Sequence, residues 1–469
     1  MRSLPTGTSA TSTFRVVFLS RPSPCVALRV ALMRVALMRV ALCAICLAAC
    51  DQRPSGGSVV TISGSALGTE GAVLRRQIAR FRAQHPTLRV EIQPTPDDAT
   101  QRHQLYVQWL NAHAGAPDIL QLDVVWTPEF AAAGWILPLD RFSPARDSFF
   151  KATVEANVWS GKLYAIPWFV DVGLLYWRTD LLAHAPASMA ELVQLAREGM
   201  TAPGGARYGI VWQGARYEGL VTVFLEHLGG FGGRIMTGDG RVVVDSPEAI
   251  RALTFMRDAI YGSRIAPQEV LTWHEEEARF AFQNGSAVFM RNWPYAYALL
   301  AGGADSRVRA KFAVTTMPAA PGGRPTAALG GAQLALNAYS RAPDSAYAVI
   351  AYLTAPAQML ERAEVVGQFP TRPALYDDPR LTAALDVPPA DARRAIERAT
   401  PRPVIPIWTQ LSELLQIQLH RALARQTSPE EALRTAAREM NALVERTRVR
   451  ELMAGTVAAE TVTAEAVER

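Results

Sequence analysis

The sequence has few residues of the kinds that carry redox, metal or covalent chemistry. Only four of its 469 residues are cysteines, and only seven are histidines. The cysteines stand at positions 25, 43, 46 and 50, so the rest of the chain has no disulfide and no cysteine-ligated metal. The histidines show no HExxH or other tight ligand spacing, and each is interpreted as a surface or hydrogen-bonded residue. We therefore expect no metal site and no cofactor.

Lysine is also scarce, and the basic excess is confined to one end of the chain. Three of the 48 basic residues are lysines, and the net charge of +5 at first suggests a nucleic-acid partner. Residues 1–49 contain six arginines and no acid, which leaves 48 − 6 = 42 basic residues against 43 acidic ones. No basic stripe remains, so we expect no nucleic-acid partner. The GxSxG, P-loop and dinucleotide fingerprints are missing as well, which removes the sequence support for three large enzyme classes.

Hydrophobic runs long enough for a membrane span are missing too, and the apolar run near the front is Val40–Ala49. A transmembrane helix needs ~20 apolar residues. Arginines precede the run, it ends in Leu-Ala-Ala-Cys, and a flexible Ser-Gly-Gly-Ser tether follows. The pattern resembles a bacterial lipoprotein signal, in which residues 1–49 are removed, Cys50 is acylated, and 50–57 form a linker. The alternative is a buried strand or helix end with an accidental cysteine.

The start of this signal is open. A signal of 49 residues is long, and the pentapeptide ALMRV occurs twice, at 31–35 and 36–40. Met33 would begin a signal of more usual length, and we hypothesise that translation begins there.

After residue 57, strand-like and helix-like segments alternate. Hydrophobic periodicity predicts strands at 58–62, 88–92 and 117–122, and helices at 70–85 and 99–114. This alternation implies a parallel sheet with helices on both faces. A second α/β stretch begins near Tyr164, and the chain from Ser345 onward is mostly helical. Ligands of such folds bind beyond the carboxyl ends of the strands or between domains, and Asp123, Asp171 and Trp212 each follow a strand-like run.

Tryptophan, in contrast, is plentiful. All ten tryptophans stand after residue 50, many of them beside proline, glycine or an acid, and residues 291–297 read RNWPYAY. Aromatic faces cover the flat C–H faces of sugars, and carboxylates accept hydrogen bonds from sugar hydroxyls. A single tryptophan is more often a core residue than a binding platform, so composition leaves both interpretations open.

The acidic triplet Glu275–Glu277 has two interpretations. With Asp123 and Asp171 it would supply the carboxylate pair of an exported glycoside hydrolase. It is also typical of a helix N-terminus, where the helix dipole favours negative charge. The helix interpretation is favoured for the triplet as a whole.

Six long motifs, in order, resemble the extracellular solute-binding proteins (family 1) of sugar ABC importers, most nearly the trehalose/maltose-binding branch. The motifs are PDILQLDVVWTPEFAAAGWILPLD (117–140), LYAIPWFVDVGLLYWRTDLL (163–182), YGIVWQGARYEGLV (208–221), EEEARFAFQNGSAVFMRNWPYAY (275–297), ALGGAQLAL (328–336) and PRPVIPIWTQLSE (401–413). The resemblance implies the two-lobed α/β fold of periplasmic binding proteins, with a ligand cleft between lobes joined by hinge segments. It implies lobes of 58–167 plus 319–370 and of 168–318 plus 371–469.

The resemblance also implies a set of ligand contacts. They are Glu70, Arg102, Asp123, Asp171, Glu275, Trp293, Gly330, Gly331 and Arg402. In the family, the acids and arginines hydrogen-bond sugar hydroxyls, the tryptophan stacks on the sugar, and the glycine pair lets the backbone approach it. Pro294 and Tyr297 are then expected to shape the turn and core around Trp293, and Tyr295 fits either role.

This sequence departs from the family pattern at two positions. The related Gly-Gly-Trp motif reads Gly-Gly-Ala here, with Ala332 in place of an aromatic wall, and Phe169 stands where a relative carries tyrosine. Either Ala332 leaves room for a different sugar, or another tryptophan such as Trp168 fills the space.

We therefore expect a binding protein that performs no chemistry on its ligand. It would be a monomer, lipid-anchored on the periplasmic side of the membrane, that delivers a disaccharide to the transmembrane subunits of an ABC permease. Trehalose is the first candidate, then maltose or a related glucoside. An exported glycoside hydrolase and a sugar-sensing receptor subunit remain the alternatives.

Overall fold

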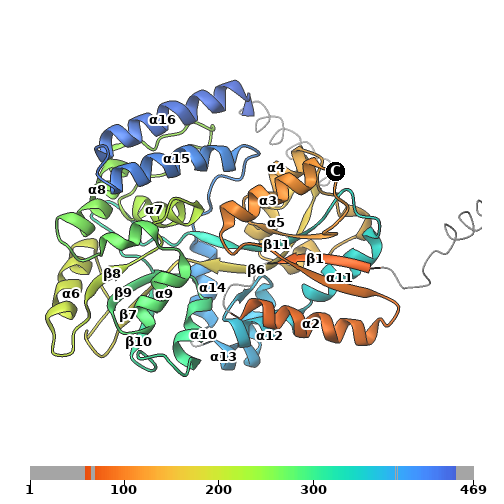
Figure 1. Ribbon diagram of the computed structural model, residues 1–469, viewed down its shortest axis with the longest axis horizontal. Helices are drawn as coiled ribbons and strands as arrows, with labels where there is room; N and C mark the ends of the chain where they lie inside the picture. The colour runs from red at the N-terminus through yellow and green to blue at the C-terminus, as the bar shows by residue number, and fades with distance from the viewer. Residues whose placement is uncertain (1–58, 65–68, 386, 388, 450–469) are drawn as a thin grey trace, which may run out of the picture. The chain divides into compact units, whose positions relative to one another are not determined.

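The computed structural model describes residues 59–64, 69–385, 387 and 389–449 (Figure 1). The predicted export signal, Cys50 and the linker lie outside the described residues. Residues 58–469 cluster as one compact unit. Within the described residues, no helix has both the length and the apolar character needed to cross a bilayer.

The larger sheet has six strands in the order β12-β6-β11-β3-β1-β2. Its bounds are β1 Val59–Gly64, β2 Arg89–Pro94, β3 Ile119–Asp123, β6 Ala165–Val172, β11 Leu329–Leu336 and β12 Phe369–Pro370. β1, β2 and β3 are parallel and are joined through α2 (Glu70–Gln84) and α3 (Ala99–Asn111), as the alternating pattern predicts. The sheet as a whole is mixed, because β11, which comes later in the chain, pairs antiparallel with both β3 and β6. The local alternation of strands and helices does not predict that a strand from a distant segment, such as β11, inserts into the sheet.

The smaller sheet has four strands in the order β10-β7-β9-β8. Its bounds are β7 Leu174–Arg178, β8 Tyr208–Val211, β9 Ala287–Asn292 and β10 Phe312–Thr315. Its helices are α6 Met189–Thr201, α7 Glu218–Gly230, α8 Pro247–Tyr261, α9 Glu275–Gln283 and α10 Tyr295–Gly302. Every residue of α7 is buried, so α7 is a central helix rather than an amphipathic surface one.

The remaining elements are short connections and a helical C-terminal part. The connections are α4 Thr127–Ala132, η1 Asp140–Phe142, η2 Arg146–Ser148, α5 Lys151–Glu155, β4 Val158–Trp159, β5 Lys162–Leu163 and η3 Gln268–Thr272. The later helices are α11 Pro343–Leu353, α12 Pro356–Val366, η4 Pro373–Asp377, α13 Pro379–Ala384, α14 Pro389–Arg398, α15 Trp408–Leu423 and α16 Pro429–Arg446. Figure 1 shows α15 and α16 side by side, above α7.

The chain passes between the two sheets beside a buried ion pair. β6 of the larger sheet and β7 of the smaller one are separated only by Gly173, whose amide donates to the Ala328 carbonyl oxygen at 3.1 Å. The Ala328 amide in turn donates to Glu226 Oε1 at 3.3 Å. Glu226 of α7 pairs with Arg291 of β9, and their side chains are 1% and 0% exposed. Two separate passages between the sheets therefore meet at one buried carboxylate.

Gly173→Ala is expected to destabilise the protein by about 3 kcal/mol or more. An added Cβ would lie 1.7 Å from Glu226 Oε1 and 2.6 Å from Arg291 Nη2, so the buried pair would have to separate. Urea denaturation followed by circular dichroism measures the loss. Gly238→Ala is the matched control, because a Cβ at that position meets nothing within 4 Å. Equal denaturation midpoints for the two variants would contradict the interpretation.

Candidate functional site

One cavity gathers all nine residues that the sequence predicts as ligand contacts. Its walls include Glu70, Arg102, Asp123, Asp171, Glu275, Trp293, Gly330, Gly331 and Arg402. The first residue of α2, the last of β3 and part of β11 come from the larger sheet and its helices. The first residue of α9 and the segment after β9 come from the smaller one. The cavity thus lies where the ends of elements from both sheets meet, as expected for a ligand site in an α/β fold.

Trp293 is held in place on several sides. The guanidinium carbon of Arg291 lies 3.9 Å from the centre of its ring. Its backbone amide donates to Asn292 Oδ1 at 2.8 Å, and its indole Nε1 donates to Glu275 Oε1 at 3.3 Å. A Cβ on Gly330 would lie 3.0 Å from the indole, so the glycine leaves room for the ring beside β11. The half-buried ring is a rigid aromatic surface in the wall of the cavity.

The other aromatics of RNWPYAY divide between the cavity and the core. Tyr295 lines the cavity and donates its hydroxyl to Glu276 Oε1 at 2.7 Å. Tyr297 packs against Phe312 of β10, with ring centres 4.7 Å apart. Tyr297 therefore lies in the packing of the smaller sheet, as expected from the sequence, whereas Tyr295 serves both the wall and the helix start.

The acidic triplet begins α9 and also reaches the cavity. Glu275 lines the cavity, Glu276 pairs with Arg279 at 2.6 Å, and Glu277 accepts from the His274 amide at 2.9 Å. The predicted helix N-terminus is confirmed. Only the first acid of the three faces the cavity, which is the residue that the family resemblance singles out.

Arg402 joins the larger sheet to the start of α7. Its terminal nitrogens donate to Asp123 Oδ1 at 2.7 Å and to Glu218 Oε1 at 2.8 Å. Trp408 Nε1 also donates to Glu218 Oε1, at 3.0 Å. The Nε of Arg402 is buried and has no hydrogen-bond partner within the described part of the chain. Two nitrogens of Arg402 thus hydrogen-bond protein carboxylates, whereas its Nε is available to donate to another partner.

Asp171 is the carboxylate with the most unusual environment. It pairs with Gly330 across the β6–β11 ladder, and its Oδ1 is buried without a hydrogen-bond partner among the described residues. Burial and, to a smaller extent, the charges of Glu70 and Asp123 raise the pKa of Asp171 to about 8, against the opposing effect of Arg362 and Arg291. The group is therefore largely protonated at neutral pH and is able to donate a hydrogen bond into the cavity.

A second layer of side chains supports the acid on α2. Gln368 donates to Glu70 Oε1, and Arg362 Nε donates to Gln368 Oε1 at 2.9 Å. The Arg362 guanidinium also stacks on Trp168, 4.0 Å from the ring centre. Trp168 is 2% exposed and does not line the cavity, so it does not fill the space opposite Ala332.

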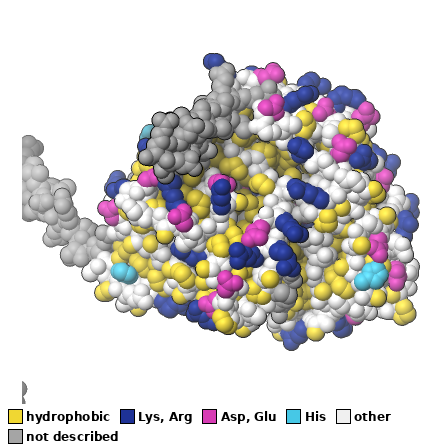
Figure 2. All heavy atoms as spheres, turned by 180° about the vertical axis from the view of Figure 1, so that it is seen from behind, with side chains coloured by type: hydrophobic (Ala, Val, Ile, Leu, Met, Phe, Trp, Pro, Cys, Tyr) yellow, Lys and Arg dark blue, Asp and Glu magenta, His cyan; other side chains and the backbone are white. Residues whose placement is uncertain are grey.

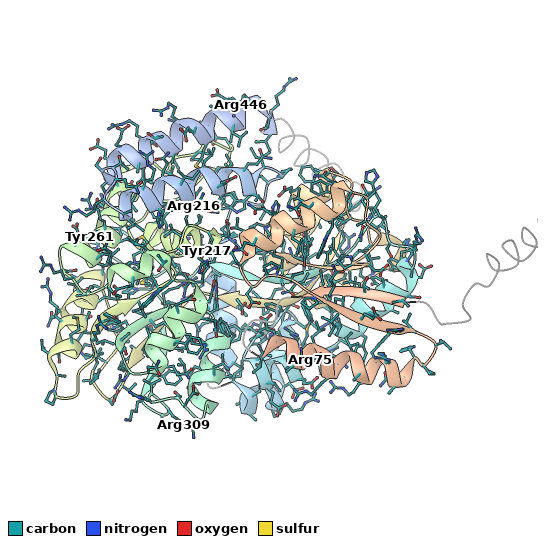
Figure 3. All side chains as sticks on the ribbon, in the orientation of Figure 1. Arg75, Arg216, Tyr217, Tyr261, Arg309 and Arg446 are labelled. Atoms are coloured by element: carbon teal, nitrogen blue, oxygen red, sulfur yellow. The ribbon has the colours of Figure 1, made fainter. Side chains whose placement is uncertain are left out.

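Sequence reasoning missed Tyr217 and Glu218, which also line the cavity. Tyr217, labelled in Figure 3, directly precedes α7. A Cβ on Gly219 would lie 2.2 Å from the Tyr217 hydroxyl, so this glycine is required for the ring's position. The hydroxyl is buried and has no hydrogen-bond partner in the described residues. The Tyr-Glu-Gly sequence lies inside the third motif, YGIVWQGARYEGLV (208–221), and is the one signal in the sequence that points to Tyr217.

The chemistry of the cavity suits a neutral, hydroxyl-rich molecule. Aromatic rings supply flat apolar faces, and the acids and arginines supply acceptors and donors. No group of three or more His, Cys, Asp or Glu side chains in the described residues is arranged to hold a metal ion. The face of the molecule in Figure 2 carries arginines and acids interspersed with apolar side chains.

Asp171→Asn is expected to stabilise the ligand-free protein, and more so at higher pH. A folded-state pKa of about 8 against an ordinary value of 3.8 means that the carboxyl disfavours folding as it ionises. The gain in Tm should be near zero at pH 4 and grow to roughly 2 °C or more at pH 9. Scanning calorimetry from pH 4 to 9 measures it. The exposed Asp147→Asn control should show no such trend, and a pH-independent difference for Asp171→Asn would contradict the interpretation.

Comparison with known proteins shows the family to which this chain belongs. The family model for bacterial extracellular solute-binding proteins matches residues 65–360. A probable ABC transporter-binding protein of Deinococcus radiodurans is 36% identical over 361 residues, which is 74% of this chain and 84% of that protein.

Solved structures give the same result for the fold. Maltose-bound MalE3 of T. maritima is 42% identical, with a TM-score of 0.78, and the match covers 82% of this chain and 99% of that one. The GacH receptor of Streptomyces glaucescens is 24% identical with a TM-score of 0.74, covering 83% and 99%, and supports the fold alone. The two-lobed fold predicted from the sequence is confirmed, and the chain belongs to the bacterial extracellular solute-binding proteins.

Proposed function

We propose that this protein is the lipid-anchored, sugar-binding component of an ABC importer. Its cargo is a disaccharide, with trehalose as the first candidate and then maltose or a related glucoside. The observation that carries the proposal is the cavity itself, in which an immobilised tryptophan lies among carboxylates from both sheets. The similarity to a maltose-bound protein at 42% identity supports a sugar of this size.

The nine cavity residues take the roles that their chemistry suggests. Trp293 stacks on a sugar ring, and the carboxylates accept hydrogen bonds from hydroxyls. The backbone of Gly330 and Gly331 lies against the ligand, because neither residue has a side chain there. Protonated Asp171 either donates to a sugar oxygen or loses its proton on binding. Arg402 aligns Asp123 and Glu218 and offers its free Nε.

Transport follows from a difference in stability between two conformations. The two lobes, assigned to 58–167 plus 319–370 and 168–318 plus 371–469, close around the sugar by a hinge motion. The closed form is the one that the membrane permease accepts, so cargo binding shifts the population toward delivery. The chain is not an enzyme, since its family consists of solute-binding proteins, and this sets aside the glycoside hydrolase considered from the sequence.

Trp293→Ala should weaken sugar binding about ten- to a hundredfold, the loss of one desolvated aromatic contact. Calorimetric titration of residues 58–469 with trehalose, maltose and sucrose measures it and names the cargo. Trp159→Phe is the control, because Trp159 lies in β4 and does not line the cavity. Saturable binding that is unaffected by Trp293→Ala would show that the sugar binds elsewhere. Binding to none of the three sugars would contradict the proposed cargo class.

Cys50→Ser should release the full-length protein from the membrane fraction, because Cys50 is the proposed site of acylation. Metabolic labelling with a fatty acid and membrane fractionation measure the change. Ala48→Ser, two residues away, is the control, since it leaves the cysteine in place. Membrane association that survives loss of Cys50 would contradict the lipid anchor and leave the sugar site untouched.

A further inference from the structure

Two helices that belong to different sheets begin opposite each other. Asp98 is the N-cap of α3, which connects β2 to β3 in the larger sheet, and its Oδ1 accepts from the Gln101 amide at 2.8 Å. His274 is the N-cap of α9, which leads to β9 in the smaller sheet. A capping box with Glu277 fixes its position at the start of that helix. Both residues are therefore rigidly placed by their own helices.

The two N-caps contact each other. His274 Nε2 lies 3.1 Å from Asp98 Oδ2, and the two residues are 176 positions apart in the sequence. The His274 ring also packs on Tyr217, with ring centres 4.5 Å apart. The Asp98 side chain is 13% exposed and that of His274 is 39% exposed, so the pair lies at the edge of the solvent.

This contact borders the cavity without lining it. Asp97 and Ala99, on either side of Asp98, belong to the cavity wall, and so do Tyr217 and Glu275 on the side of His274. Neither Asp98 nor His274 is itself part of the wall. The pair thus closes the space between two walls of the site and leaves the ligand contacts to other residues.

We propose that Asp98 and His274 form a clasp across the two lobes that holds the cavity shut around its cargo and sets how slowly the cargo leaves. This inference rests on the proposed function, because it requires a cargo. The contact between Asp98 and His274 is independent of that function. The clasp joins the lobes only when they are together, so its free energy adds to the closed form alone. Such a difference between two conformations is what shifts their populations.

The clasp is sensitive to pH in a defined direction. The hydrogen bond to Asp98 raises the pKa of His274 above its ordinary 6.5, burial opposes the rise, and the charges of Asp98, Glu275 and Glu277 add to it. Those acids and the Tyr217 ring are the groups that face the imidazole from α3, α9 and the start of α7. A raised pKa means that the ion pair is fully present below the ordinary value and is lost as pH rises through the raised one.

The test uses variants that keep both helix caps and remove only the contact. Asp98→Ser and His274→Asn place good N-cap residues at both positions, with side chains too short to meet. Each should speed dissociation of the sugar identified by titration roughly three- to fivefold, measured by stopped-flow tryptophan fluorescence. The double variant should be no faster than the faster single variant, since both remove the same interaction. His184→Asn, an exposed histidine paired with Glu191, is the control and should change nothing.

The pH dependence of the dissociation rate is a second test, because a purely structural role of His274 would leave that dependence unchanged. Between pH 6 and 9, dissociation from the parent protein should accelerate more than dissociation from His274→Asn. The titration of Asp171 is common to both proteins and cancels in the comparison. Additive effects in the double variant, or equal pH profiles, would overturn the clasp.

A cross-linking experiment separates failure of the clasp from failure of the proposed function. Residues 58–469 form their own compact unit and contain no cysteine, so Asp98→Cys with His274→Cys gives a protein with only two thiols. A short bismaleimide should link them in a 1:1 intramolecular product, more rapidly with saturating sugar. If the titration finds a sugar that binds, equal linking rates with and without that sugar would overturn the clasp. If the titration finds none, the proposed cargo fails, and linking still shows the contact. No linking under either condition would overturn the clasp whatever the protein binds.

Discussion

Glu226 of α7 and Arg291 of β9 form a buried ion pair at the junction of the two sheets. Neither side chain is more than 1% exposed, so each charge is stabilised by the other and by nearby polar groups instead of by water. Glu226 also accepts the amide of Ala328, and Arg291 donates to Gln213 Oε1 at 3.1 Å. Removing either partner would leave an uncompensated charge beside two passages between the sheets. The pair is thus both a structural requirement and the centre of the junction.

The same pair reaches the candidate site through a single ring. The Arg291 guanidinium faces Glu226 at its edge and Trp293 with its plane, so the position of the tryptophan follows from that of the ion pair. A cation beneath an aromatic ring costs little conformational entropy once the cation is already fixed. The wall that is proposed to stack on a sugar is therefore continuous with the region where the two sheets join.

Two arginines, Arg402 in the cavity wall and Arg362 outside it, shape the charge environment of the cavity's carboxylates. Arg402 is committed to Asp123 and Glu218, and Arg362 supports Glu70 through Gln368. Asp171 receives no hydrogen bond from either arginine, and burial beside Glu70 raises its pKa. The result is a cavity rich in acceptors in which one carboxyl stays protonated. Such a mixture is suited to hydroxyl groups, each of which both donates and accepts a hydrogen bond.

Local periodicity predicted many of the helices and strands, and the long ordered motifs predicted the family and nine residues of the cavity wall. Helices α2 and α3 begin at residues 70 and 99, as the periodicity predicts, and all nine expected contacts line one cavity. Three features became visible only in the folded chain: β11 runs antiparallel between β3 and β6, Tyr217 joins the wall, and Asp98 contacts His274. These features depend on contacts between residues far apart in the chain, and no local pattern of side chains records which distant partner a residue will meet once the chain folds.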